Sequence, residues 1–93
     1  MRIKHDGTNG SIDNYTGDLL IRDNADDKDF VLQSDNGSGG LADYIRLDGS
    51  TTLTQFDKDT KHSDGVKATF GAGSDLQIYH NGSDSYIEEA GTG

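Results

Sequence analysis

The stretch from Ile78 to Gly93, IYHNGSDSYIEEAGTG, is similar to the stretch from Ile3 to Gly17, IKHDGTNGSIDNYTG. At an offset of 75 positions, apolar, His and Gly residues coincide: Ile3, His5, Gly7 and Ile12 fall on Ile78, His80, Gly82 and Ile87. Turns rich in Gly, Ser, Asn and Asp can look alike by chance, but these coincidences include apolar and His positions. Self-similarity at a fixed offset indicates a repeat architecture. We therefore predict that residues 1–17 are the end of one repeat and that residues 18–93 are one further repeat of about 75 residues, cut at the equivalent point.

The composition favours turns and short strands. The chain has 17 acidic residues, 15 of them Asp, and 8 basic residues, which gives a net charge of -9. It also has 13 Gly and no Pro. Asp bonds its own backbone in turns and is a poor residue for helix interiors. Leu, Ile, Val and Phe make up only 18 of the 93 residues, slightly less than the roughly 20% below which a highly charged chain tends to stay disordered. We expect a chain of this kind to gain its missing burial by association with identical copies.

Composition also bears on partners and cofactors. The chain has no Cys, so neither disulfides nor thiolate metal sites can support it. Its negative charge argues against nucleic acid and against anionic membranes. No run approaches the roughly 18 apolar residues that span a bilayer. We expect no cofactor, no nucleic acid partner and no membrane insertion.

Short apolar and polar alternations, separated by turn residues, predict an all-β chain with little or no helix. Leu76, Ile78 and His80 alternate with Gln77 and Tyr79. The other predicted strands are Val66–Phe70, Tyr44–Asp48, Asp18–Arg22, Asp29–Gln33, Thr51–Phe56 and short pieces around Ile3, Ile12 and Ile87. The charged stretch Asp23–Asp29 is predicted to be a solvated turn between two of these strands.

Each predicted strand carries only two or three apolar residues on one face, too few to fill a sandwich core about 10 Å thick. Narrow stripes suit an elongated, repetitive fibre in which three intertwined chains turn their apolar residues toward a common axis. A homotrimeric β-fibre is therefore our predicted fold, with a small β-sandwich or β-roll as the alternative. The predicted positions of the oligomer core are Ile3, Ile12, Leu19, Ile21, Val66, Phe70, Leu76, Ile78 and Ile87.

Catalysis finds little support. Any Ser, any of the three His and any of 15 Asp could be assembled into a triad on paper, and such abundance makes a match uninformative. His5 and His80 occupy equivalent places in the repeat, which favours structural roles. We predict a protein without enzymatic activity, with no catalytic residues and no assigned metal ligands.

A calcium-stabilised, β-rich module that binds glycans or acts as an adhesin is the alternative function. Ca²⁺ prefers clustered oxygen ligands, which Asp-Gly-Asn turns offer. Gly71, Gly73 and Asp75 fit the calcium-binding β-roll nonapeptide, but Phe70 and Gln77 do not, and the motif occurs once. The four Tyr side chains could contact sugar rings, although exposed strand Tyr residues more often cover their neighbours.

Four segments resemble elements of the repeat of tail fibre proteins of tailed bacteriophages, especially marine ones. In that repeat the element matched by Asp75–Ile87 leads into the other three. The matching segments are Asp75–Ile87, Thr16–Ile21, Ala25–Gly40 and Leu47–Ser50. This resemblance implies a non-enzymatic structural segment of a tail fibre, part of the extracellular virion, that serves as a spacer and possible host-adhesion element. It further implies that the chain pairs with itself as a homotrimer and contacts a bacterial surface glycan or receptor. The family offers no catalytic residues to carry over onto this segment.

Overall fold

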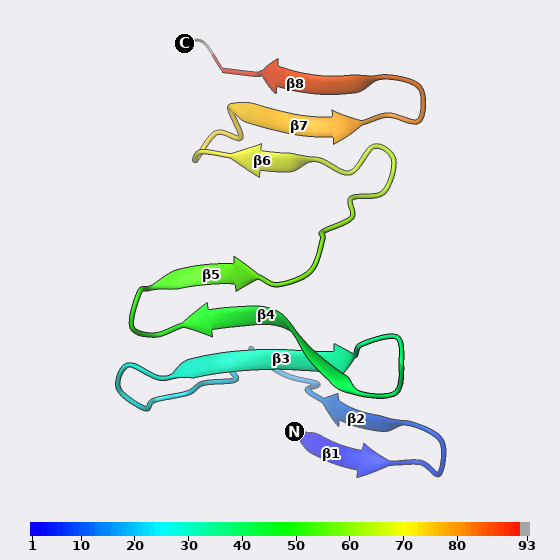
Figure 1. Cartoon of the computed structure of the whole chain (residues 1–93), viewed down its shortest axis with the longest axis vertical. Helices are drawn as coiled ribbons and strands as arrows, with labels where there is room; N and C mark the ends of the chain where they lie inside the picture. Colours follow the sequence, from blue (N-terminus) through cyan, green and yellow to red (C-terminus); the bar gives the residue numbers. More distant parts are fainter. Residues whose placement is uncertain (92–93) are drawn as a thin grey trace. The chain divides into compact units, whose positions relative to one another are not determined.

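The computed structural model describes residues 1–91, and this range is all-β, as predicted. Eight strands form three small antiparallel sheets with the orders β1-β2, β3-β4-β5 and β6-β7-β8 (Figure 1). The strands are β1 (Arg2–His5), β2 (Gly10–Asp13), β3 (Asp29–Asp35), β4 (Leu41–Asp48), β5 (Leu53–Phe56), β6 (Ala68–Phe70), β7 (Leu76–His80) and β8 (Ser85–Glu89). Residues 1–91 contain no helix, and hence none that could cross a membrane.

The chain divides into two compact units, Met1–Gln55 and Phe56–Gly93. The first contains the β1-β2 hairpin and almost all of the β3-β4-β5 sheet, and the second contains the β6-β7-β8 sheet. The division into repeats after residue 17 concerns sequence periodicity rather than compactness, and it stays a prediction.

Two hairpins pair in the same register. In the β1-β2 hairpin Ile3 lies opposite Ile12, and in the β7-β8 hairpin Ile78 lies opposite Ile87. All four positions are the ones that coincide at the 75-residue offset. The sequence similarity therefore corresponds to the same strand pairing.

The turn of the β1-β2 hairpin is organised by Asp6. Its backbone N–H donates to the carbonyl of Asn9 at 3.0 Å. Its carboxylate accepts the N–H groups of Thr8 at 2.9 Å and Asn9 at 2.7 Å. Gly7 has a φ of 95°, a left-handed conformation that glycine adopts at little cost.

The turn of the β7-β8 hairpin uses the same bonds around Asn81. The Asn81 N–H donates to the carbonyl of Asp84 at 3.0 Å. The Asn81 side-chain oxygen accepts the N–H groups of Ser83 at 2.9 Å and Asp84 at 2.8 Å. Gly82 has a φ of 100°. An Asp or Asn side chain can cap such a turn equally well, which explains why the two turns agree despite the exchange.

The central sheet pairs β3 with β4 so that Phe30 lies opposite Leu47 and Leu32 opposite Ile45. The register shifts between Leu32 and Gln33, which marks a β-bulge. Because side chains alternate along a strand, these four apolar residues share one face before the bulge.

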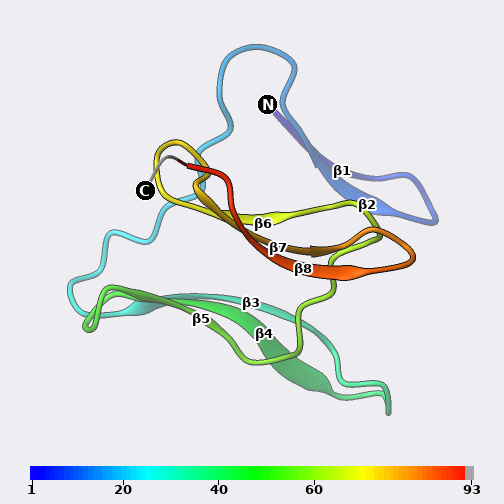
Figure 2. The ribbon, with the colours of Figure 1, turned by 90° about the horizontal axis from the view of Figure 1, so that it is seen from above.

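The prediction of a strand at Asp18–Arg22 is wrong for the single chain. No strand is present between residues 14 and 28, and the light-blue trace that joins β2 to β3 carries no arrow (Figure 2). The predicted turn Asp23–Asp29 therefore does not join two strands, and its last residue, Asp29, already begins β3. The pattern of residues identifies a segment that can pair, but a strand forms only where a partner edge exists.

Four other strand boundaries differ from the prediction. β3 ends later, at Asp35 rather than Gln33. β4 begins earlier, at Leu41. β5 begins later, at Leu53, because Thr52 has a φ of 59° and donates its N–H to the Asp48 carbonyl in a turn. β6 begins at Ala68, since Val66 is held in a turn by donating its N–H to Ser63 at 2.9 Å.

No residue in the described range 1–91 is buried, so neither unit has a closed hydrophobic core there. Large apolar side chains such as Ile3, Leu20 and Ile87 are 72%, 63% and 81% exposed. Folded domains normally place such residues inside.

Candidate functional site

One face of the β6-β7-β8 sheet gathers apolar side chains from all three strands. Ala68, Ile78 and Ile87 form one row across the sheet, and Phe70 lies opposite Leu76 in the next row. Alternation along the strands directs all five to the same side, and we call them the apolar face. The exposed fractions are 81% for Ile87, 50% for Phe70, 42% for Ile78 and 38% for Leu76.

The opposite side of the same sheet is held together by aromatic and polar contacts. The rings of Tyr79 and Tyr86 stack with centroids 4.9 Å apart and an interplanar angle of 20°. The ammonium of Lys67 lies 4.6 Å from the centre of the Tyr79 ring, a cation–π arrangement. The Tyr79 hydroxyl donates to Glu88 at 2.6 Å. Chiefly because of this hydrogen bond to a carboxylate, the pKa of Tyr79 is raised above its usual 10.0.

On β7 the apolar side is more exposed than the polar side. Gln77 and Tyr79, on the polar side of β7, are half-buried by their neighbours, whereas Leu76 and Ile78 on the apolar face are exposed. An exposed apolar patch surrounded by polar residues is typical of an interaction surface. The apolar face is therefore the candidate functional site.

The structure brings some of the predicted core positions together and separates others. Phe70, Leu76, Ile78 and Ile87 meet on the apolar face, while Val66 lies in the turn before β6. Ala68 belongs to the face but was absent from the predicted core set.

In the first unit, Ile3 and Ile12 face each other across the β1-β2 hairpin, whereas Leu19 and Ile21 lie in the segment without strand pairing. Whether any of these nine positions is buried in an oligomer stays a prediction.

A cross-strand ion-pair network lies on the β3-β4 pair. Arg46 contacts Asp29 at 2.7 Å and Asp43 at 2.5 Å, and the Gln33 amide donates to Asp43 at 2.7 Å. The pKa of Asp43 is lowered, first by the hydrogen bond from Gln33 and then by Arg46. Because Asp43 and Gln33 are paired just after the bulge, the network favours the local register.

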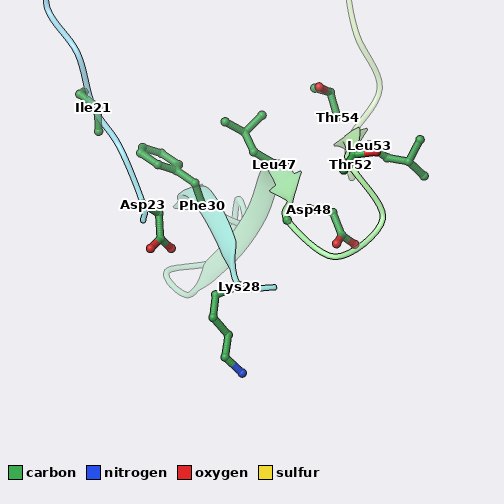
Figure 3. A pocket seen from close by; sticks show the side chains of 10 residues that line it. Ile21, Asp23, Lys28, Phe30, Leu47, Asp48, Thr52, Leu53 and Thr54 are labelled. Carbon is green, nitrogen blue, oxygen red and sulfur yellow. The ribbon is translucent and has the colours of Figure 1, made fainter. Parts of the chain in front are cut away.

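An open cavity of about 380 Å³ lies in the first unit, between the strand-free segment that precedes β3 and the β3-β4-β5 sheet. In Figure 3 the Phe30 ring points toward Ile21 across one side of it. The apolar lining of the cavity also includes Leu47 and Leu53, and its polar lining includes Asp23, Lys28 and Asp48. Ile21 lines this cavity and remains 60% exposed.

The segment that partly fits the calcium β-roll forms a hairpin turn instead. Residues 71–74 join the antiparallel strands β6 and β7, with the Ser74 N–H donating to the Gly71 carbonyl at 3.1 Å. A β-roll repeat joins parallel strands, so this alternative is wrong for Gly71–Asp75. Within residues 1–91, no group of three or more His, Asp or Glu side chains is placed to hold a metal ion.

The two repeat-related His residues make local hairpin contacts. The His5 Nδ1 accepts the Gly7 N–H at 3.1 Å, and the His80 Nδ1 lies 2.9 Å from the Ser85 hydroxyl.

Comparison of the chain with models of protein families, with curated proteins and with solved structures finds no match. The class that the structure defines is therefore an all-β chain of small antiparallel sheets with an uncovered apolar face. The resemblance to phage tail fibre repeats stays a prediction.

Proposed function

We propose that this protein is a non-enzymatic structural segment of a phage tail fibre, a spacer and host-adhesion element of the extracellular virion that assembles as a homotrimer. The ordered motifs from Thr16 to Ile87 support the family. The structural observation that carries the proposal is the apolar face, on which Phe70, Leu76, Ile78 and Ile87 from three paired strands are all exposed.

Burial of the apolar face between copies would supply what the single chain lacks. Fully burying a side chain of this kind contributes about 1.5–3 kcal/mol, and the face offers Phe70, Leu76, Ile78 and Ile87. Three copies that turn this face toward one axis would leave the Tyr79–Tyr86 side of each sheet in water. A closed, symmetric arrangement of this kind also limits further association.

The test is a charge placed on the apolar face. Ile87→Asp changes a side chain that is 81% exposed in the single chain, so a monomer would tolerate it. In an assembly the same change buries an unpaired carboxylate, which costs several kcal/mol in each copy. We expect Ile87→Asp to abolish assembly, measured by light scattering and thermal unfolding.

The matched control is Thr69→Asp, because Thr69 is an exposed residue on the opposite face of β6 in the same sheet. It should leave the assembly and the unfolding temperature nearly unchanged. An Ile87→Asp chain with the mass and stability of the wild type would overturn the proposal.

The virion location is tested separately by immuno-electron microscopy. Antibodies raised against the purified chain should label the tail fibres of tailed virions whose genomes encode this sequence. Labelling confined to host debris would contradict the assignment.

A second candidate function, a calcium-stabilised glycan-binding module, is favoured by one observation. The stacked Tyr79–Tyr86 pair offers an aromatic surface, with Tyr86 37% exposed, and aromatic faces suit sugar rings. This candidate predicts that a chelator lowers the unfolding temperature, because an ion bound only to the folded state stabilises it by mass action. The fibre proposal predicts no effect of the chelator.

A further inference from the structure

Asn is followed by Gly at three exposed turns of the chain. The pairs are Asn9-Gly10, Asn36-Gly37 and Asn81-Gly82. An Asn side chain in such a pair can react with its own backbone, because Gly has no side chain to hinder the approach of its amide nitrogen to the Asn carboxamide carbon. The hydrogen bonds around the three pairs differ, and they single out one of them.

Hydrogen bonds restrain the first two pairs. The carbonyl of Asn9, which belongs to the peptide group between Asn9 and Gly10, accepts the Asp6 N–H at 3.0 Å. The Gly37 N–H donates to the Asp35 carboxylate at 2.8 Å. Attack requires this peptide group to rotate and the Gly nitrogen to give up its proton. A hydrogen bond to either end of the peptide group therefore opposes the reaction, because it must first be broken.

The peptide group between Asn81 and Gly82 has no such restraint. Within residues 1–91, neither the Asn81 carbonyl nor the Gly82 N–H makes a hydrogen bond to the protein. The Asn81 side-chain oxygen accepts the N–H groups of Ser83 and Asp84, which stabilise the negative charge that this oxygen acquires when its carbon is attacked. Asn36 has two donors of the same kind. The Gly82 N–H without an acceptor is thus what distinguishes Asn81 in the described part of the chain.

The sequence explains why the Gly82 N–H has no acceptor. In the equivalent turn of the first hairpin, the His5 Nδ1 accepts the Gly7 N–H at 3.1 Å. At the 75-residue offset His80 takes the place of His5, but Ser85 stands where the first hairpin has a glycine. The Ser85 hydroxyl lies 2.9 Å from the His80 Nδ1. It therefore occupies the atom that would otherwise accept the Gly82 N–H.

We propose that Asn81 is a site of spontaneous deamidation. The Gly82 nitrogen attacks the Asn81 carboxamide carbon and the new bond closes a succinimide ring. The bond to the side-chain nitrogen breaks, and ammonia leaves with the proton of the Gly82 N–H. Water then hydrolyses the ring. Opening at the side-chain carbonyl gives Asp, and opening at the backbone carbonyl gives isoaspartate, in which the main chain runs through the former side chain.

The two products affect the second hairpin in opposite ways. The Asp product keeps the turn closed and adds a negative charge, because the Asp6 carboxylate accepts the same two N–H groups in the first hairpin. Isoaspartate lengthens the backbone within the turn, which disturbs the register that places Ile87 opposite Ile78. The isoaspartate product therefore removes Ile87 from the apolar face. This effect on assembly rests on the proposed function, whereas the reaction itself does not.

Peptide mapping by mass spectrometry tests the site on the full chain during incubation in mildly alkaline buffer. We expect Asp and isoaspartate to accumulate at position 81 several-fold faster than at positions 9 and 36. Asn81→Asp is the matched reference for the Asp product, and its β7-β8 amides should keep their protection from hydrogen exchange. Deamidation of Asn9 or Asn36 that is as fast as that of Asn81 would overturn the assignment.

The variant Ser85→Ala tests the structural cause. Loss of the hydroxyl releases the His80 Nδ1 to accept the Gly82 N–H, as in the first hairpin, and should slow deamidation at position 81 several-fold without changing position 36. His80→Ala combined with Ser85→Ala removes the acceptor again and should restore the wild-type rate. An unchanged rate in Ser85→Ala would contradict the role of the Gly82 N–H.

Light scattering on fresh and incubated protein separates the modification from the assembly. We expect the unassembled fraction of the incubated protein to be enriched several-fold in isoaspartate at position 81. A chain that assembles but does not deamidate at Asn81 contradicts only this inference. A folded monomer that deamidates at Asn81 contradicts only the proposed function.

Discussion

The β1-β2 and β7-β8 hairpins share the same strand pairing and the same turn but carry different residues on one face. Both pair an Ile with an Ile at equivalent positions and close with a turn capped by an Asp or Asn side chain. On the other face, the cross-strand pair is Lys4 with Ser11 in the first hairpin and Tyr79 with Tyr86 in the second. Turn chemistry determines register, since it is local, whereas the face residues are free to differ.

The two hairpins also differ in the elements that lie beside them. The β7-β8 hairpin has β6 beside it and a stacked Tyr pair on its polar face, whereas the β1-β2 hairpin has neither within the described residues 1–91. We therefore expect the β7-β8 hairpin to be more stable than the β1-β2 hairpin.

The largest expected effect comes from disrupting the turn of either hairpin. Gly7→Val and Gly82→Val each force a β-branched residue into the left-handed region at a cost of roughly 1–3 kcal/mol. Each variant should open its own hairpin and leave the other intact, as measured by amide hydrogen exchange. The control is Gly10→Ala, where a methyl group would meet its nearest atoms at 3.7 and 3.8 Å, an ordinary contact. Equal protection in Gly7→Val and wild type would contradict the role of the turn.

An exchange of the cross-strand pairs Lys4–Ser11 and Tyr79–Tyr86 should make the stabilities of the two hairpins more alike. Lys4→Tyr with Ser11→Tyr introduces the aromatic pair into the first hairpin, and stacked pairs contribute about 0.5–1.5 kcal/mol. The exposed Lys4–Asp13 ion pair that is lost contributes little. Conversely, Tyr86→Ser should weaken the second hairpin by a similar amount. Protection that rises, or falls, in both variants would contradict the stabilising role of the Tyr pair.

Acid should affect the first turn selectively. Hydrogen bonds from Asn9 and Thr8 to the Asp6 carboxylate lower the pKa of Asp6 from 3.8. The carboxylate therefore stabilises the folded turn above pH 3.8, and this contribution is lost as pH falls through the lowered pKa. The amide resonances of Thr8 and Asn9 should shift in this range, while Asn81 keeps the second turn closed. Asp6→Asn should abolish the shift, and a shift that persists would identify another titrating group.

Alkali should affect the second hairpin selectively and more weakly. Because the pKa of Tyr79 is raised from 10.0 by Glu88, the neutral phenol stabilises the folded hairpin below pH 10.0. That contribution is lost as pH rises through the raised pKa. Tyr79→Phe should remove the dependence, as followed by the exchange of β8 amides, and the β1-β2 hairpin should not respond. A parallel response of both hairpins would indicate global unfolding.

Local features of the fold could be predicted from the sequence. The strand Leu76–His80 follows from alternation alone, and the turns follow from Asp6-Gly7 and Asn81-Gly82. The strand prediction at Asp18–Arg22 is wrong because alternation shows only that a segment can pair. Whether it does pair depends on an available strand edge, which alternation does not show.

Contacts between residues distant in sequence could not be predicted. Arg46 reaches Asp29 across 17 positions, and this contact depends on the register in which β3 pairs with β4. The stack of Tyr79 on Tyr86 depends on the hairpin register, which the sequence alone leaves open. Alternation within a strand places Leu76 with Ile78, and Ala68 with Phe70, on one side of their own strands. That these residues and Ile87 share one face depends on the pairing of three strands, and their role as an oligomer core stays a prediction.

Self-association is tested most directly by the mass of the purified chain in solution, measured by light scattering with and without a chelator. We expect a mass about three times that of the 10.0 kDa chain, unchanged by the chelator. A folded monomer with its apolar face in water would contradict it, and a monomer that loses structure with the chelator would favour the calcium-stabilised module.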